Sequence, residues 1–415
     1  MASPRRTIHT TCCIAGGGPA GMMLGYILGR AGVDVVVLEK HADFLRDFRG
    51  DTLHPSTLEV MHELGLLDAL LKLPHQEVPR ISGTFEGRTF VAADFSRLPT
   101  RCKFIALMPQ WDFLNFLVAQ SAPFSNIRVL MQHQAVGLLQ EHSRVYGLTA
   151  NSPGGTVDIH ADLVVAADGR HSTVRELSGL SVEDLGAPID VLWMRISRKA
   201  DDTGQGLGHI HGGRLVVLIN RGEYFQCGLV IAKGGAEQIR AGGLPALQQT
   251  LSAIVPMLRD RVGELDDWDK VKLLSVQVNR LRQWYQPGLL SIGDAAHAMS
   301  PMGGVGINLA IQDAVAAANL LAAPLRERAV TERVLDNFQH RREWAVRLTQ
   351  QAQVVGQARI FQGLAGGATT LKLPLALRWI PTGLLPRILG RAIGMGVRPE
   401  HVNRAIFVSS DTRPA

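Results

Sequence analysis

The sequence predicts an α/β fold: a Rossmann-like dinucleotide-binding domain with an inserted mixed β-sheet domain and a helical C-terminal segment. Three observations support it. Residues 10–40 follow the pattern strand, glycine turn, helix, strand, and two further buried strands end in glycine–acid turns at 168–169 and 293–294. Residues 182–272 contain successive apolar, β-rich runs separated by turn residues. At 415 residues the chain also exceeds one ordinary core, which favours two domains.

The first glycine turn, "GGGPAG" at residues 16–21, lies between the run "TTCCIA" and an apolar helix. Gly16 permits the tight turn, Gly18 lets the backbone approach a pyrophosphate, and Gly21 lets the helix pack closely on the strand. The phosphates would bind the first amides of that helix. Glu39 ends the second strand, where a carboxylate accepts both hydroxyls of an adenosine ribose. The predicted contacts in this region are Gly16, Gly18, Pro19, Ala20, Gly21, Glu39 and Lys40.

The two later turns indicate which dinucleotide binds. "ADLVVAADGRHSTVRELSG" (161–179) is a buried strand that ends at Asp168-Gly169, with Arg175 in the helix that follows. "GLLSIGDAAHAMSPMGGVGIN" (288–308) is another strand, which ends at Gly293-Asp294. The first turn alone fits either NAD or FAD. FAD in an extended conformation is long enough to need several strand ends along its length. The three strand ends therefore indicate FAD.

In order and separation, these motifs resemble those of the class A FAD-dependent monooxygenases, the para-hydroxybenzoate hydroxylase family of aromatic hydroxylases, across roughly residues 8–345. The resemblance implies a glutathione reductase-type FAD domain, non-covalently bound FAD, and NADPH or NADH as co-substrate without a separate nicotinamide domain. It also implies that Asp294 holds the ribityl hydroxyls and that the backbone at Pro301 lies beside the isoalloxazine. Amides at the helix start after Gly304 would stabilise negative charge at the pyrimidine edge of the flavin.

The resemblance places further FAD contacts along the chain. Arg49 falls where the family has an arginine near the phosphates or the moving flavin, with Arg46 as the alternative. Gln110 matches a glutamine that contacts the ribityl chain. The contacts implied beyond the first turn are Arg46, Arg49, Gln110, Asp168, Gly169, Arg175, Gly293, Asp294, Pro301, Gly304, Gly306, Ile307 and Asn308.

The strand-rich region is the expected substrate domain, because in the resembling family such a sheet covers the flavin and supplies much of the pocket. Trp193 and Arg195 share one face of a predicted strand, and Tyr224 and Gln226 share one face of another. Each of the four side chains either lines the substrate pocket or occupies a packed or solvated position on the other side of its strand. The expected FAD domain is 1–80, 106–181 and 273–345, the substrate domain is 81–105 and 182–272, and the C-terminal segment is 346–415.

The implied reaction is hydroxylation of an aromatic substrate, phenolic or hydrophobic and polycyclic, with NAD(P)H and O2 through a flavin C4a-hydroperoxide. A phenol must lose a proton, which calls for a base or relay. His211, Tyr224 and Arg195 are the candidate catalytic residues. His209 and His211 have no acidic or cysteine partner nearby, so no metal site is predicted. The alternatives are a quinone-biosynthesis hydroxylase at the membrane surface, an epoxidase or Baeyer–Villiger oxygenase on the same scaffold, and a flavin-bound sensory or structural protein.

The net charge of +6 is concentrated near the C-terminus. Between Trp344 and Pro399 there are seven Arg and Lys residues and no Asp or Glu, so the rest carries 36 basic and 37 acidic residues. This balance argues against nucleic acid as a partner. The basic segment either packs on the protein, forms a homodimer face, or contacts an anionic membrane surface. Unpaired cysteine spacing, the lack of a secretory signal and the lack of a long apolar run favour a cytoplasmic protein.

Overall fold

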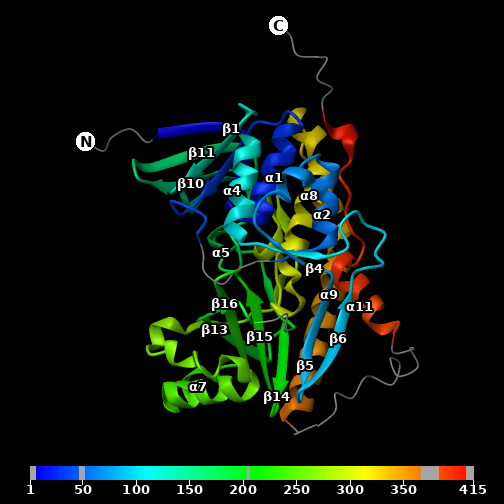
Figure 1. The fold of residues 1–415 in the computed structure, drawn as a ribbon. Helices are drawn as coiled ribbons and strands as arrows, with labels where there is room; N and C mark the ends of the chain where they lie inside the picture. Colours follow the sequence, from blue (N-terminus) through cyan, green and yellow to red (C-terminus); the bar gives the residue numbers. More distant parts are fainter. Residues whose placement is uncertain (1–5, 46–51, 203–205, 366–382, 408–415) are drawn as a thin grey trace.

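The computed structural model describes residues 6–45, 52–202, 206–365 and 383–407, with the side chains of 359–365 excepted. Two large sheets organise these residues, and Figure 1 shows the first in the upper half of the molecule and the second in the lower half. The fold class predicted from the sequence is confirmed: an α/β domain, a second mixed sheet and helices toward the C-terminus.

The first sheet has eight strands in the order β19-β20-β11-β1-β2-β8, and β10 and β9 extend it from β11. Its central pairs are parallel, so the carboxyl ends of β1, β2 and β11 lie at one edge. The strands are β1 (Arg6–Ala15), β2 (Val35–Glu39), β8 (Ile127–Met131), β9 (Gln134–Glu141), β10 (Arg144–Ser152), β11 (Gly155–Ala166), β19 (Tyr285–Gln286) and β20 (Leu289–Ser291).

Both faces of this sheet are covered, which explains the continuous apolar run in β1. Cys12 and Ile14 point into the main core with the helices α1 (Pro19–Arg30), α4 (Gln110–Ser121) and α8 (Gly306–Arg326). Cys13 and Ala15 point into a second core under β9, β10 and α5 (Thr173–Ser178). Within the described ranges, one helix, Met302–Arg326, is long and apolar enough to cross a membrane. Since 78% of its most apolar window is buried in the protein, it is the central helix of this core.

The second sheet has seven strands in the order β17-β13-β16-β15-β14-β5-β6. Only β14 and β5 pair in parallel; the other pairs are antiparallel. Two separated chain segments therefore build one sheet. The strands are β5 (Arg80–Phe85), β6 (Arg88–Asp94), β13 (Ile189–Ser197), β14 (Gly208–His211), β15 (Arg214–Asn220), β16 (Tyr224–Ala232) and β17 (Lys272–Leu274). A short turn at residues 221–223 joins β15 to β16.

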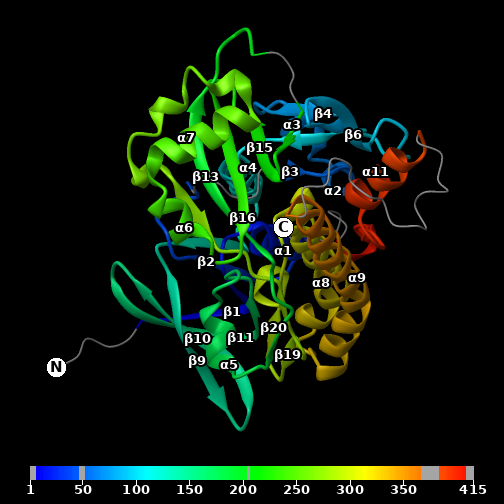
Figure 2. The ribbon, with the colours of Figure 1, turned by 90° about the horizontal axis from the view of Figure 1, so that it is seen from below.

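Strand alternation gives the second sheet two different faces. On one face, residues such as Leu192, Met194 and Val216 pack against α6 (Ala236–Ala241) and α7 (Gly243–Ile254), which lie outside the sheet in Figure 2. The opposite face, with Val191 and Val217, is directed toward the first domain and lines the cavity described below.

The remaining elements connect the sheets and cover their edges. They are β3 (Thr52–Leu53), β4 (Gln76–Val78), β7 (Ile105–Leu107), β12 (Val182–Asp184), β18 (Asn279–Leu281), β21 (His297–Ala298), α2 (Pro55–Glu63), α3 (Leu67–Leu70), α9 (Glu332–Ala365), α11 (Leu385–Met395), η1 (Pro256–Leu258), η2 (Val262–Glu264), η3 (Trp268–Lys270), η4 (Gly293–Ala295), η5 (Met302–Gly304) and η6 (Arg404–Ile406). The long helix α9 runs beside α8 (Figure 2).

The basic C-terminal segment packs on the protein where it is described. Helix α11 lies against β6, and a Cβ at Gly390 would lie 2.1 Å from the carbonyl oxygen of Asp94. Helix backbone and strand therefore touch directly. Lys372, Arg378 and the rest of 366–382 lie outside the described residues.

Candidate functional site

A cavity of about 740 Å³ lies between the two sheets. One end is formed by the strand ends of the first sheet and by the starts of α1 and α8. The other end is formed by the second sheet. All three glycine-containing turns identified in the sequence contribute to its lining, although they are separated by more than 100 residues in the chain.

The first turn has the geometry that its glycines predict. Gly16 has φ +112°, and a Cβ there would lie 2.3 Å from the carbonyl oxygen of Ala167. A Cβ at Gly21 would lie 1.9 Å from the carbonyl oxygen of Gly16, so α1 packs directly on the turn. Gly18, in contrast, has no atom within 4 Å of its Cβ position. It faces the cavity and precedes α1 without a side-chain cap, which leaves the first helix amides available to an anion.

The end of β2 forms the neighbouring wall. Glu39 is 9% exposed, and its carboxylate accepts a hydrogen bond of 3.0 Å from the backbone N–H of His41. Lys40 and His41 line the cavity with it, as do Gln134, the first residue of β9, and His133, which precedes it. His41, His133 and Gln134 were not predicted, since no sequence motif marks them.

The second turn is held by its own polar side chains. The carboxylate of Asp168 accepts hydrogen bonds from the Ser172 hydroxyl and, at 3.1 Å, from the backbone N–H of Val174. Burial raises the pKa of Asp168, and these hydrogen bonds oppose the rise. Asp168 therefore fixes the turn. It also lines the cavity, together with Gly169, which has φ +87° and open space at its Cβ position.

Arg175 joins the second turn to the third. Its guanidinium donates to the carbonyl oxygens of Arg170 at 2.7 Å and Ala295 at 3.3 Å, and the residue is buried. It was predicted as an FAD contact, but these bonds give it a positioning role. Asp294 in the third turn lines the cavity, and Arg170 approaches its carboxylate at 3.5 Å. Arg170 was not identified from the sequence.

A buried carboxylate supports the third turn from behind. Asp313 in α8 accepts the backbone N–H of Gly293 at 2.9 Å, His297 Nε2 at 2.6 Å and Arg342 Nε at 2.8 Å. Burial by itself would raise the pKa of Asp313, but His297 and Arg342 outweigh it and lower the pKa to about 2. Arg342, from α9, also lies 3.4 Å from Glu400. This charged cluster orients Gly293 and hence the turn.

The start of α8 is shaped by close contacts with β3. Gly304 has φ +63°, and a Cβ there would lie 2.5 Å from Thr52 Oγ1. The Asn308 amide donates at 3.1 Å to the carbonyl oxygens of Thr52 and Gly304 and accepts from the backbone N–H of His54 at 2.8 Å. Asn308 therefore orders the loop instead of facing the cavity. Pro301, Gly304, Gly306 and Ile307 line the cavity, and α8 begins without a side-chain cap.

The second sheet gives the cavity an apolar end. Its lining includes Ile81, Phe90, Ala92, Ile189, Val191, Trp193, Leu207, Ile210, Leu215, Val217, Ile219, Val230 and Leu274. Gly228 makes room for the indole of Trp193, since a Cβ there would lie 2.7 Å from the ring. Gln226 also lines the cavity, and its side-chain oxygen accepts two hydrogen bonds from Arg221. Within the described ranges, no charged side chain of the second sheet lines this cavity.

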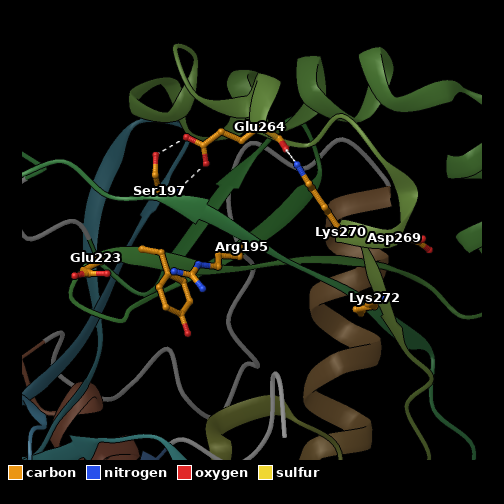
Figure 3. Close-up of a pocket in the computed structure, with 8 residues that line it drawn as sticks. Arg195, Ser197, Glu223, Glu264, Asp269, Lys270 and Lys272 are labelled. Atoms are coloured by element: carbon orange, nitrogen blue, oxygen red, sulfur yellow. Dashed lines mark hydrogen bonds between the residues drawn. The ribbon is translucent and has the colours of Figure 1, made fainter. Parts of the chain in front are cut away.

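The three predicted catalytic residues do not lie at this cavity. His211 is paired with Glu86 at 2.8 Å on the outer side of β14, while Gly208 and Ile210 of the same strand face the cavity. Arg195 and Tyr224 line a separate cavity of about 480 Å³ (Figure 3). There the guanidinium carbon of Arg195 lies 3.8 Å from the centroid of the Tyr224 ring.

The other predicted contacts divide in a similar way. Gln110 begins α4 and lines the large cavity, as predicted. Arg46 and Arg49 lie outside the described residues. Trp193 and Gln226, two of the four pocket candidates, line the large cavity.

The cavity fits an extended FAD. The carboxylates of Glu39 and Asp294 lie at separate places in the cavity, where they could accept from the ribose hydroxyls and the ribityl hydroxyls. The amides at the start of α1 lie between them and suit a pyrophosphate. Gly306, whose Cβ position has only Met299 Cβ near it at 3.8 Å, leaves the start of α8 open to a planar ring. These residues would hold adenosine, pyrophosphate, ribityl chain and flavin in that order.

Comparison with known proteins agrees with this geometry. Residues 9–352 match the FAD binding domain family. A 6-methylpretetramide 4-monooxygenase from Streptomyces rimosus is 32% identical over 85% of this chain and 84% of its own. A rifampicin monooxygenase from Streptomyces venezuelae is 30% identical over 72% of this chain and 61% of its own.

Solved structures show the same fold. The anhydrotetracycline hydroxylase OxyS from Streptomyces rimosus aligns with a TM-score of 0.73 at 20% identity, over 94% of this chain and 77% of its own. At that identity the likeness concerns the fold alone. Together with the family match over most of the chain, these findings identify it: the chain belongs to the FAD binding domain family and is an FAD-dependent monooxygenase.

Proposed function

We propose that this monooxygenase hydroxylates a neutral, ring-fused aromatic substrate, phenolic and largely apolar, with O2 and NADPH or NADH. The observation that carries the proposal is the lining of the cavity at the second sheet. It consists of aliphatic and aromatic side chains together with a few neutral polar groups. Among the residues that the structure describes, this end offers no cation to pair with a substrate carboxylate, so desolvation of that carboxylate would be costly.

The extent of the apolar end also supports a ligand larger than one ring. Each of the seven strands of the second sheet contributes at least one residue to its lining, beyond the residues that would hold FAD. The name of one relative, a 6-methylpretetramide 4-monooxygenase, agrees with a substrate of several fused rings.

The chain contributes binding, orientation and the exclusion of water. When bound, FAD supplies electron transfer from NAD(P)H and the activation of O2. The amides at the start of α8, free of a side-chain cap, stabilise negative charge on a ring placed against Gly306. The apolar side chains of β13, β14 and β15 remove water from the substrate and strengthen its polar contacts.

A comparison of substrates tests the proposal. FAD-loaded protein is given NADPH or NADH with 2-naphthol, 2-hydroxyanthracene or para-hydroxybenzoate, and both NAD(P)H consumption and hydrogen peroxide release are measured. The ring-fused phenols should accelerate NAD(P)H consumption and lower the peroxide released per NAD(P)H, whereas para-hydroxybenzoate should do neither. Coupled turnover of para-hydroxybenzoate alone would contradict the proposal, because no described residue at the apolar end supplies a cation for its carboxylate.

A further inference from the structure

Two buried polar side chains lie at the apolar end of the cavity, where the loop before α8 meets α9. Ser300 in the loop is 1% exposed, and Gln357 in α9 is 2% exposed. Both belong to the cavity lining, and the Gln357 amide nitrogen donates to the Ser300 hydroxyl oxygen. Their neighbours in the loop, Pro301 and Met302, line the same cavity.

Gln357 follows two other buried glutamines on α9, Gln350 and Gln353, and its hydrogen bonding differs from theirs. Gln350 donates to the carbonyl oxygens of Asn279 and Ala298 and accepts from Arg280. Gln353 accepts the backbone N–H of Ser300 at 3.2 Å and donates to the carbonyl oxygens of Ser300 and Met302. In Gln350 and in Gln353, the amide oxygen and the amide nitrogen therefore both have hydrogen-bond partners in the protein. The side-chain oxygen of Gln357, in contrast, is buried with no partner among the described residues.

A count of donors and acceptors shows that Ser300 and Gln357 retain hydrogen-bonding capacity. The Ser300 oxygen accepts from the Gln357 amide and, at 3.2 Å, from the backbone N–H of Met302. Its own hydrogen then remains to be donated, beside the unpaired Gln357 oxygen. With the amide turned by 180°, Gln357 would accept from Ser300 and its NH₂ group would be left unpaired instead. In either orientation, one buried polar group lacks a protein partner, which is costly unless a ligand satisfies it.

We propose that Ser300 and Gln357 bind the phenolic hydroxyl of the substrate and so select its orientation in the cavity. The inference rests on the proposed function, since it requires an aromatic alcohol in the apolar end. A hydroxyl both donates and accepts, so it satisfies the pair in either amide orientation. Gln226, another polar group at this end, has its oxygen occupied by Arg221. Gln357 is therefore a specificity-determining residue supplied by the helix behind the loop, not by the substrate sheet.

The test compares 2-naphthol with 2-methoxynaphthalene, which has the same rings but no hydroxyl hydrogen. Dissociation constants are measured by calorimetry on the FAD-loaded protein, without turnover. Wild-type protein should bind 2-naphthol about tenfold more tightly. Gln357→Met, which keeps the length of the side chain, should bring this ratio near one and leave the affinity for the ether unchanged. Ser300→Ala should lower the ratio in the same direction.

Gln350→Met is the matched control. It removes bonds to Asn279, Ala298 and Arg280 but none to Ser300, so it should lower thermal stability while keeping the preference for 2-naphthol. Wild-type preference that persists in both Gln357→Met and Ser300→Ala overturns the inference and leaves the proposed function intact. Failure of wild-type protein to bind either naphthalene overturns the proposed function and this inference with it. FAD content and thermal unfolding of each variant identify any that do not fold, in which case the remaining variant decides.

Discussion

The substitution Asp313→Asn should destabilise the protein strongly although Asp313 does not line the cavity. Asp313 is fully buried and accepts hydrogen bonds from Gly293, His297 and Arg342. Removing one member of a buried charged pair costs about 3–5 kcal/mol, because the partner charge stays buried. Glu400, 3.4 Å from Arg342, remains as a second partner. We therefore expect a loss of about 3 kcal/mol in the free energy of unfolding at pH 7.

The pH dependence of stability gives a second, independent value for the contribution of Asp313 to the free energy of unfolding. The folded pKa of Asp313 is about 2, below the reference value of 3.8, so the charged form is stabilised by folding. This shift corresponds to about 2 kcal/mol of stability at neutral pH. Because the pKa is depressed, the contribution is complete above pH about 4 and is lost as the pH falls toward 2. The stability difference between wild type and Asp313→Asn should shrink by about 1 kcal/mol between pH 5 and pH 3.

Urea unfolding followed by circular dichroism, together with flavin release followed by fluorescence, measures both effects. Asp336→Asn is the matched control, since Asp336 is a partly exposed carboxylate that accepts from the Tyr285 hydroxyl. It should cost less than about 1 kcal/mol. A loss below about 1 kcal/mol for Asp313→Asn, or a difference independent of pH, would refute the reasoning about the buried cluster.

Three further substitutions separate cofactor binding from substrate binding. Gly18→Val should fold but purify without FAD, since the valine side chain meets no protein atom and enters the cavity. The control Gly263→Val, at a glycine that is equally open but remote from the cavity, should keep its FAD and stay yellow. Equal FAD content of the two variants by absorbance would count against the position given to the pyrophosphate. Asp294→Ala should weaken FAD at least about tenfold in a fluorescence titration, through loss of a carboxylate acceptor; unchanged affinity would contradict its role. Gly228→Ala should push the Trp193 indole into the cavity, which should raise KM for 2-naphthol and leave the FAD content unchanged. An unaltered KM would show that Trp193 lies away from the substrate.

The parts of the site that were predicted from the sequence are those specified by local chain geometry. The glycines at 16, 18 and 21 have separate steric roles within one turn, and each role is visible in the spacing. The strand ends at Asp168 and Asp294 were located for the same reason. Parallel strands then bring their carboxyl ends to one edge without further information.

Residues that act across long chain separations were not predicted. The bond between Arg342 and Asp313 joins α9 to α8, and no local pattern indicates it. His211 lies on β14, and strand alternation alone leaves open which face of a strand is inward. In β14 the inward residues are Gly208 and Ile210. Arg195 shares its face with Trp193 but lies at a smaller cavity farther along the strand. Gln357 lies in a long polar helix whose buried side is set by the loop it contacts.

Transfer of an oxygen atom from O2 to a ring-fused aromatic substrate is the central claim, and isotope labelling measures it directly. FAD-loaded protein is supplied with NAD(P)H and 2-naphthol under ¹⁸O₂, and the product is analysed by mass spectrometry. We expect a hydroxylated product that carries one ¹⁸O atom from the gas. A product whose new oxygen comes from water, or complete diversion of the electrons to hydrogen peroxide with every ring-fused phenol offered, would contradict it.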